Sequence, residues 1–105
     1  NMFRDFTYID DIIPGLKAAI TKNYDCEIFN LGNNQPEKVT KIIKVIESSL
    51  NKKAIVNLRL MQLGDVDRTY ADISKAQRML SFKPTTNIEE GISKFVKWYN
   101  NYRTI

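Results

Sequence analysis

The chain has 105 residues and a mass of 12.2 kDa, which is room for one modest domain and excludes a second lobe of ordinary size. Apolar residues make up 43% of it and charged residues 27%, with four glycines and three prolines, a balance that excludes a disordered or fibrous chain. The net charge of +4 is weaker than most dedicated nucleic-acid-binding domains carry, so we expect no nucleic-acid partner.

The first third of the sequence predicts an extended segment, a helix and a strand. Residues 4–9 are typical of a short extended piece, after which Asp10 or Asp11 is expected to cap a helix and Pro14 to fall in its first turn. Apolar residues recur at helical spacing there, at Ile12, Ile13, Leu16, Ala19 and Ile20. Residues 26–31 alternate like a strand, with Cys26 expected in the core, and end at a turn in residues 32–34.

The rest of the sequence predicts three further helices and one strand. The first helix is expected to begin near Pro36, with Val39, Ile42, Ile43, Ile46 and Leu50 at helical spacing. Residues 54–60 favour a strand, and residues 61–67 a loop. Asp72 is expected to cap the next helix, with Ile73, Ala76 and Leu80 inward, and Thr86 with Glu89 has the spacing of a capping box for the last one. Its apolar stripe is Ile88, Ile92, Phe95, Val96, Tyr99 and Tyr102.

Together these elements predict a mixed α/β (α+β) fold of about four helices with a few short strands. The aromatic group Phe95, Trp98, Tyr99 and Tyr102 could stack on a base, but its spacing on one helix favours packing in the core or against another lobe.

The sequence has few residues of the kinds that catalyse reactions or bind metals and cofactors. The sequence has no histidine and a single cysteine, which leaves no catalytic histidine and no thiolate cluster for a metal ion. It has no glycine-rich dinucleotide turn, no phosphate loop, and no tyrosine followed four residues later by lysine. We therefore expect no catalytic, cofactor-binding or metal-binding residue. The lone cysteine and the absence of a leader or membrane-spanning stretch predict a cytoplasmic protein with no membrane partner.

Four blocks of sequence, in order, resemble one known family. They are residues 4–12 (RDFTYIDDI), 28–36 (IFNLGNNQP), 61–76 (MQLGDVDRTYADISKA), and 83–86 (KPTT) with 88–92 (IEEGI). Together they are similar to the C-terminal portion of NAD-dependent nucleotide-sugar epimerases of the extended short-chain dehydrogenase/reductase family, most closely the UDP-glucuronate 4-epimerase branch.

This resemblance implies that residues 1–105 are a single partial domain, the small C-terminal substrate-binding lobe of such an enzyme. The Rossmann lobe that carries NAD and the catalytic tyrosine and lysine would be the missing N-terminal part. The chain would then bind a UDP-sugar, bind no cofactor itself and be inactive alone. Segments such as the strand ending at Leu31 would lack partner strands, leaving apolar surface through which the chain self-associates.

The resemblance also assigns candidate binding residues. Arg4 matches an arginine that contacts the UDP diphosphate, the alternative being a surface ion pair with a neighbouring aspartate. Asp65 matches an acid that accepts hydrogen bonds from the ribose hydroxyls, or it is a turn aspartate. Many relatives carry a phosphate-binding arginine where this chain has Gln62, and Arg68, which suits the glucuronate branch, would replace that contact or be a solvated charge.

Two other interpretations remain open. One is a stand-alone module for nucleotides or polyanions that uses Arg4, Arg68 and the lysine-rich middle of the chain, where residues 36–60 hold six basic and two acidic side chains. The other is a structural or regulatory remnant that binds nothing. Titrations with UDP, UDP-glucuronate and a short DNA duplex separate these interpretations.

Overall fold

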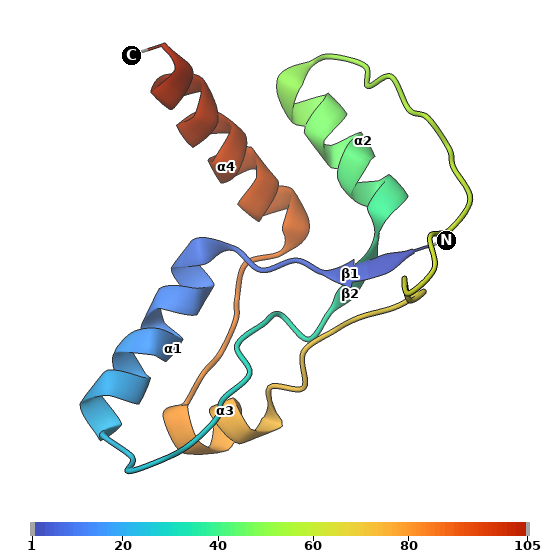
Figure 1. The fold of residues 1–105 in the computed structure, drawn as a ribbon. Coiled ribbons are helices and arrows are strands. Elements are labelled where there is room, and N and C mark those ends of the chain that lie inside the picture. Colours follow the sequence, from blue (N-terminus) through green and yellow to red (C-terminus); the bar gives the residue numbers. More distant parts are fainter. Residues whose placement is uncertain (1, 105) are drawn as a thin grey trace.

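The structure, a computed structural model, describes residues 2–104. It contains β1 (Phe3–Asp5), α1 (Ile9–Lys22), β2 (Pro36–Lys38), α2 (Val39–Leu50), α3 (Ser74–Leu80) and α4 (Ile88–Arg103). Figure 1 shows α1 with α3 on one side of the chain that leads out of β1, and α2 with α4 on the other. The predicted mixed α/β fold with four helices is confirmed.

The two strands form a small antiparallel sheet. Phe3 lies opposite Lys38, and Asp5 lies opposite Pro36. The sequence predicted that the helix would begin near Pro36, and this was wrong by three residues. The backbone amide of Val39 still donates to the carbonyl of Met2, at 3.0 Å, so pairing with β1 keeps residues 36–38 extended and delays the helix.

The best-buried cluster lies around α3 and the segments that cover it. Ile73, Ala76, Leu80 and Phe82 are buried, with Ala76 fully inaccessible, and Ala18, Ala19, Phe29, Leu31 and Ala71 pack around them. The three inward positions predicted for this helix are confirmed. A second contact joins α2 to α4, where Ile42, Ile88 and Val96 are buried.

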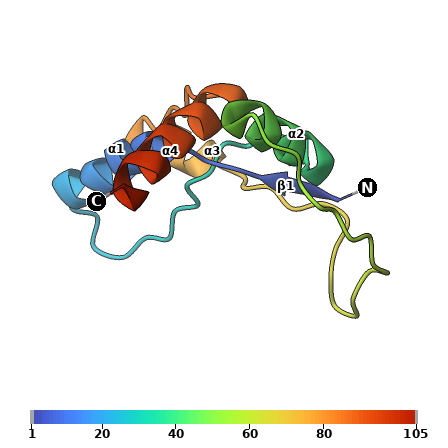
Figure 2. The same cartoon turned by 90° about the horizontal axis from the view of Figure 1, so that it is seen from above.

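The molecule is flat, with extents of 48 × 40 × 21 Å. Figure 2 shows the helices in a layer from which the loop between α2 and α3 projects. Residues 54–60 lie in this loop and form no strand, and Ile55, Leu58 and Leu60 are almost fully exposed. The predicted strand is wrong because a strand needs a neighbouring backbone for its hydrogen bonds, and none of the described residues pairs with this segment.

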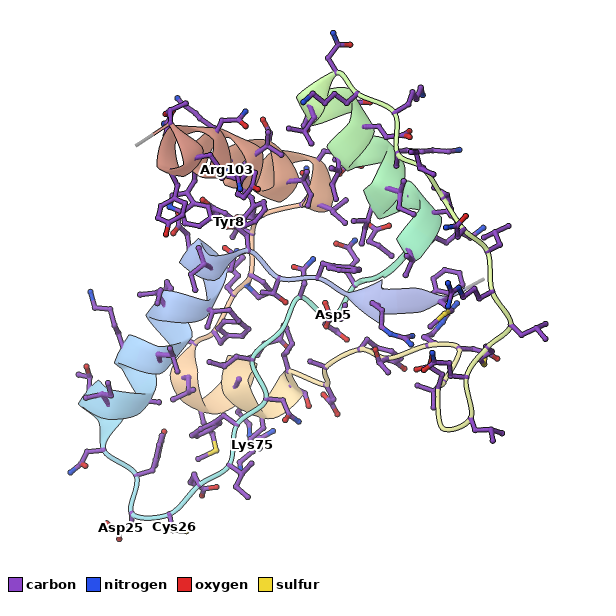
Figure 3. The ribbon with its side chains drawn as sticks, turned by 45° about the horizontal axis from the view of Figure 1, so that its top comes forward. Asp5, Tyr8, Asp25, Cys26, Lys75 and Arg103 are labelled. Atoms are coloured by element: carbon purple, nitrogen blue, oxygen red, sulfur yellow. The ribbon has the colours of Figure 1, made fainter. Side chains whose placement is uncertain are left out.

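The other predicted strand, residues 26–31, also forms no backbone ladder with the described residues. Side chains hold this segment instead: Lys75 pairs with Glu27 at 2.6 Å and lies over the ring of Phe29. Cys26 was expected in the core, but it is exposed and lies at the outer bend of the segment (Figure 3). That expectation was wrong because the segment lacks the strand partners that would enclose its side chains.

Helix α1 begins earlier than the capping prediction placed it. Tyr8 occupies the N-cap position without a side-chain cap, and Asp10 and Asp11 lie inside the first turn. Pro14 therefore lies beyond the first turn, within the helix, where its missing N–H leaves one carbonyl without its helical partner. The assignment of either aspartate as the cap of this helix was wrong, because the carboxylate of Asp11 is engaged by another segment described below.

The caps predicted for the last two helices are each displaced by one residue, since Ile73 and not Asp72 occupies the N-cap position of α3, without a side-chain cap. Asp72 Oδ1 accepts from the backbone amide and hydroxyl of Ser74, at 3.0 and 2.7 Å, and these bonds lower the pKa of Asp72. Asn87, and not Thr86, caps α4 by accepting from the amide of Glu90 at 2.9 Å. The predicted capping box of Thr86 and Glu89 was wrong, because Asp11 engages the hydroxyl of Thr86 and the cap lies one residue later.

Candidate functional site

The segment that carries Arg68 runs beside β1. Phe3 donates its amide to the carbonyl of Asp67 at 2.8 Å, and its carbonyl accepts from the amide of Thr69 at 3.2 Å. These bonds make a parallel bridge between Phe3 and Arg68. The guanidinium carbon of Arg68 lies 4.3 Å from the centre of the Phe3 ring, a cation–π contact.

Arg4 reaches the same edge of β1. Its Nη1 donates to the carbonyl of Phe3 at 2.7 Å, the oxygen that also accepts from Thr69. Adjacent strand residues point to opposite faces, so Arg4 and Arg68 approach this edge from opposite sides. Neither guanidinium forms an ion pair with a carboxylate among residues 2–104. The structure therefore leaves two uncompensated positive charges at the edge of β1 that faces residues 67–69.

The other two candidate residues lie in the projecting loop. The amide of Asp65 donates to the carbonyl of Gln62 at 3.2 Å, which closes a turn. Gly64 within it has a φ of +91°, a left-handed backbone that favours glycine. Both side chains are exposed, and Figure 2 shows the loop extending away from the helices. Arg4 and Arg68 thus reach the same edge of β1, whereas Gln62 and Asp65 lie in the projecting loop.

Sequence reasoning missed two aspartates that join distant segments. The carboxylate of Asp5 accepts backbone amides from Asn33 and Ala71, and that of Asp11 accepts the amides of Thr85 and Thr86. Aspartate is disfavoured in strands, so its presence within the predicted extended segment, residues 4–9, was the available signal for Asp5.

A cavity of about 330 Å³ lies between the start of α1 and the start of α4. Its walls are mostly apolar and include Phe6, Tyr8, Ile88, Ile92 and Phe95. None of the four candidate binding residues lines it.

A row of exposed rings continues along α4. Neighbouring centroids are 5.6 Å apart for Phe95–Trp98 and 5.5 Å for Trp98–Tyr102, and Trp98 is 56% exposed. Of the predicted stripe, Ile88 and Val96 are buried, but Phe95, Tyr99 and Tyr102 are exposed. Packing in the core of this chain was therefore wrong, because none of the described residues covers that face of α4.

The lysine-rich middle of the chain is partly neutralised. Lys41 Nζ lies 3.0 Å from Glu37 and 3.1 Å from Glu89, and these carboxylates raise its pKa. Lys53 lies 3.5 Å from Glu47. Ion pairing therefore reduces the positive potential that residues 36–60 present to solvent.

The described residues do not fit a dinucleotide cofactor. A pyrophosphate needs a glycine-rich turn between a strand and the N-terminus of a helix, in a parallel βαβ unit. Within residues 2–104 the strands are antiparallel, and Gly64, the glycine with positive φ, lies in an exposed loop. In the same range, no group of His, Cys, Asp and Glu side chains could hold a metal ion, and no helix is long and apolar enough to cross a membrane.

Comparison with known proteins gives this α/β chain its class. The profile of the GDP-mannose 4,6 dehydratase family matches residues 1–95, and the chain belongs to that family. Its sequence is 52% identical over 99 residues to an uncharacterized protein of Methanocaldococcus jannaschii, covering 94% of this chain and 30% of the relative. It is 42% identical over 113 residues to UDP-glucuronate 4-epimerase 4 of Arabidopsis thaliana, and the match covers 94% of this chain and 26% of that relative. The chain thus spans less than a third of these relatives.

Solved structures place the chain within the fold of larger enzymes. UDP-glucuronic acid 4-epimerase from Bacillus cereus, in complex with UDP-glucuronic acid and NAD, matches with a TM-score of 0.76 and 33% identity, over 90% of this chain and 32% of that one. UDP-glucose 4-epimerase from Bifidobacterium longum matches with a TM-score of 0.86 and 24% identity, over 98% of this chain and 31% of that one. At this identity the match supports the fold alone. The matched part is the C-terminal portion of the epimerase fold, as the sequence blocks predicted.

Proposed function

We propose that this chain is the UDP-sugar-binding portion of an NAD-dependent sugar epimerase, and that the parent enzyme acts on UDP-glucuronate. The observation that carries the proposal is that the guanidinium groups of Arg4 and Arg68 both reach one edge of β1, from its opposite sides, with no carboxylate partner in the described chain. A doubly charged diphosphate is the natural ligand of two such groups, because each guanidinium can donate two parallel hydrogen bonds to phosphate oxygens.

The loop between α2 and α3 supplies the remaining contacts in this proposal. Asp65 accepts hydrogen bonds from the ribose hydroxyls, and the carboxamide of Gln62 donates to a phosphate oxygen where relatives have an arginine. Both residues lie in an exposed turn, so the loop must close over the bound nucleotide to reach it. Ordering of this loop on binding therefore belongs to the proposal.

In the longer enzyme, one part binds the cofactor and carries the catalytic groups, and another part binds the substrate. The described residues offer no dinucleotide cradle, so NAD and the catalytic groups belong to an N-terminal Rossmann lobe. This chain binds and orients the nucleotide handle of the substrate, and without that lobe it is inactive. The similarity to the Bacillus cereus enzyme, whose structure contains UDP-glucuronic acid and NAD, supports this division.

Titration calorimetry on the 105-residue chain tests the proposal. UDP and UDP-glucuronate should both bind, and Arg4→Ala and Arg68→Ala should each weaken binding about tenfold or more, since a hydrogen bond to a charged group contributes about 1.5–3 kcal/mol. Arg78→Ala removes an exposed arginine from α3 and serves as the matched control, with unchanged affinity. Absence of UDP binding, or equal effects of all three variants, would overturn the proposal.

A polyanion-binding module is the alternative, and the ion pairs of Lys41 and Lys53 argue against it. A short DNA duplex in the same calorimeter decides between the two. Tight duplex binding with steep salt dependence and indifference to uridine nucleotides would favour the alternative.

A further inference from the structure

Asp5 lies where three segments distant in sequence converge, at the end of β1 (Figure 3). Its Oδ1 accepts the backbone amide of Asn33 at 3.1 Å, and its Oδ2 accepts those of Asn34 at 2.9 Å and Ala71 at 3.0 Å. One carboxylate thus joins β1 to the loop before β2 and to the segment that follows Arg68.

The backbone hydrogen bonds between β1 and the 67–71 segment are few. Phe3 makes two of them, to Asp67 and Thr69, and the next residue of β1 on the same face is Asp5. Here the side chain of Asp5, and not its backbone, accepts a hydrogen bond from the amide of Ala71. The carboxylate therefore extends the attachment of this segment beyond the single bridge at Phe3.

Close packing leaves the segment little room at this point. A Cβ atom built on Gly32 would lie 2.6 Å from the Cβ of Ala71 and 3.0 Å from Oδ2 of Asp5. The three backbones consequently meet at a distance that only glycine allows at position 32. Any shift of Ala71 relative to Asp5 would also shift Arg68, three residues earlier.

We propose that Asp5 is a positioning residue for phosphate binding: by anchoring Ala71 it holds Arg68 at the edge of β1 that Arg4 also reaches. This inference rests on the proposed function for its ligand. Asp5 itself does not touch the substrate, since its two oxygens are occupied by three backbone amides. Loss of the carboxylate frees the 67–71 segment and so loosens Arg68 from the edge of β1.

Asp5→Asn tests the proposal, because an amide keeps the shape of the side chain but has one acceptor oxygen in place of two. Asp11→Asn is the matched control: Asp11 also accepts two backbone amides, but it does so at Thr85 and Thr86, away from β1. Among folded variants, verified by circular dichroism, Asp5→Asn should weaken UDP binding about tenfold, and Asp11→Asn should leave it unchanged. Unchanged affinity in Asp5→Asn, or equal losses in both variants, would overturn the inference.

A measurement without ligand separates this inference from the proposed function. Because the guanidinium carbon of Arg68 lies 4.3 Å from the centre of the Phe3 ring, we expect the ring current to shift the side-chain NMR resonances of Arg68, and Asp5→Asn should abolish that shift. Gly32→Ala should do the same by displacing Ala71, and it replaces Asp5→Asn if that variant does not fold. If the unaltered chain binds no UDP, the proposed function fails, whereas an Arg68 resonance unchanged by these substitutions contradicts the role of Asp5.

Discussion

Asp11 is the most buried charged side chain among the described residues, at 7% exposure. It lies in α1, but its carboxylate accepts the backbone amides of Thr85 and Thr86, at 3.2 and 2.9 Å, and both of their hydroxyls. Four hydrogen bonds satisfy the buried charge and fix the entry to α4 against α1. Asp11, which the sequence predicted as a helix cap, thus connects α1 to the segment that precedes α4.

Asp11→Ala should lower the free energy of unfolding by about 2–3 kcal/mol, because it leaves the amides of Thr85 and Thr86 without their acceptor. Asp10→Ala, at the exposed neighbouring position, controls for the loss of a negative charge from the first turn of α1. Urea denaturation of the two variants gives the comparison. Equal stability of the two would contradict the assigned role of Asp11.

At the scale of elements, the helices were more predictable than the strands, of which β1 alone overlaps a segment predicted to be extended, residues 4–9. Helical periodicity located all four helices, because their hydrogen bonds lie within one continuous segment. Residues 26–31 and 54–60 have strand-like sequences, but a strand depends on a partner that periodicity does not reveal. The same limit applies to the candidate site: the motif predicts Arg4 and Arg68 as binding residues, whereas the contact of Asp5 with Ala71 joins residues 66 positions apart and no local pattern predicts it.

Gly15 marks the place where α1 lies against its neighbours. A Cβ there would lie 2.9 Å from Leu31 Cδ1 and 2.9 Å from Phe82 Cδ1. Gly15→Ala gains up to about 1 kcal/mol in helix propensity but overpacks this contact by about 1–3 kcal/mol. We expect a net loss of stability of about 1 kcal/mol by thermal or urea denaturation. Lys17→Ala, on the exposed face of the same helix, should show no such loss, and a stabilised Gly15→Ala would refute the packing argument.

The end of α2 depends on pH through Glu47. Its carboxylate accepts the backbone amide of Ala54 at 2.8 Å and lies 3.5 Å from Lys53, and both contacts lower its pKa, the amide more strongly. A lowered folded-state pKa means that the contact contributes fully above the ordinary value of about 4.3 and is lost as the pH falls through the lowered value.

An NMR pH titration of the Ala54 amide measures this release. The midpoint should lie below about 4.3, and Glu47→Gln should remove the transition. A midpoint at or above the ordinary glutamate value would contradict the contact.

The whole molecule exposes an unusual amount of apolar surface for its size. The exposed side chains include Ile9, Ile13, Leu16 and Ile20 on α1, Phe95, Trp98, Tyr99 and Tyr102 on α4, and Ile28, which is 82% exposed. Rows of exposed apolar side chains along a helix, such as those on α1 and α4, are typical of a protein face that another polypeptide covers. It agrees with a chain that spans about a third of the epimerases whose fold it shares.

We therefore expect the chain to self-associate in sedimentation experiments, with an average mass that rises with concentration, and to bind a hydrophobic dye. Trp98→Ser should reduce both effects, because it removes the central ring of the exposed row. Lys97→Ala is the neighbouring control. A monomer at every concentration that binds no dye would contradict this expectation.

The central claim is that Arg4 and Arg68 hold the diphosphate of a UDP-sugar. The most direct test is to follow the guanidinium NMR resonances of the 105-residue chain while UDP is added. The account predicts that the resonances of Arg4 and Arg68 move together and saturate at one ligand concentration, while those of Arg78 stay in place. Saturable binding of UDP that leaves both resonances unmoved would contradict it.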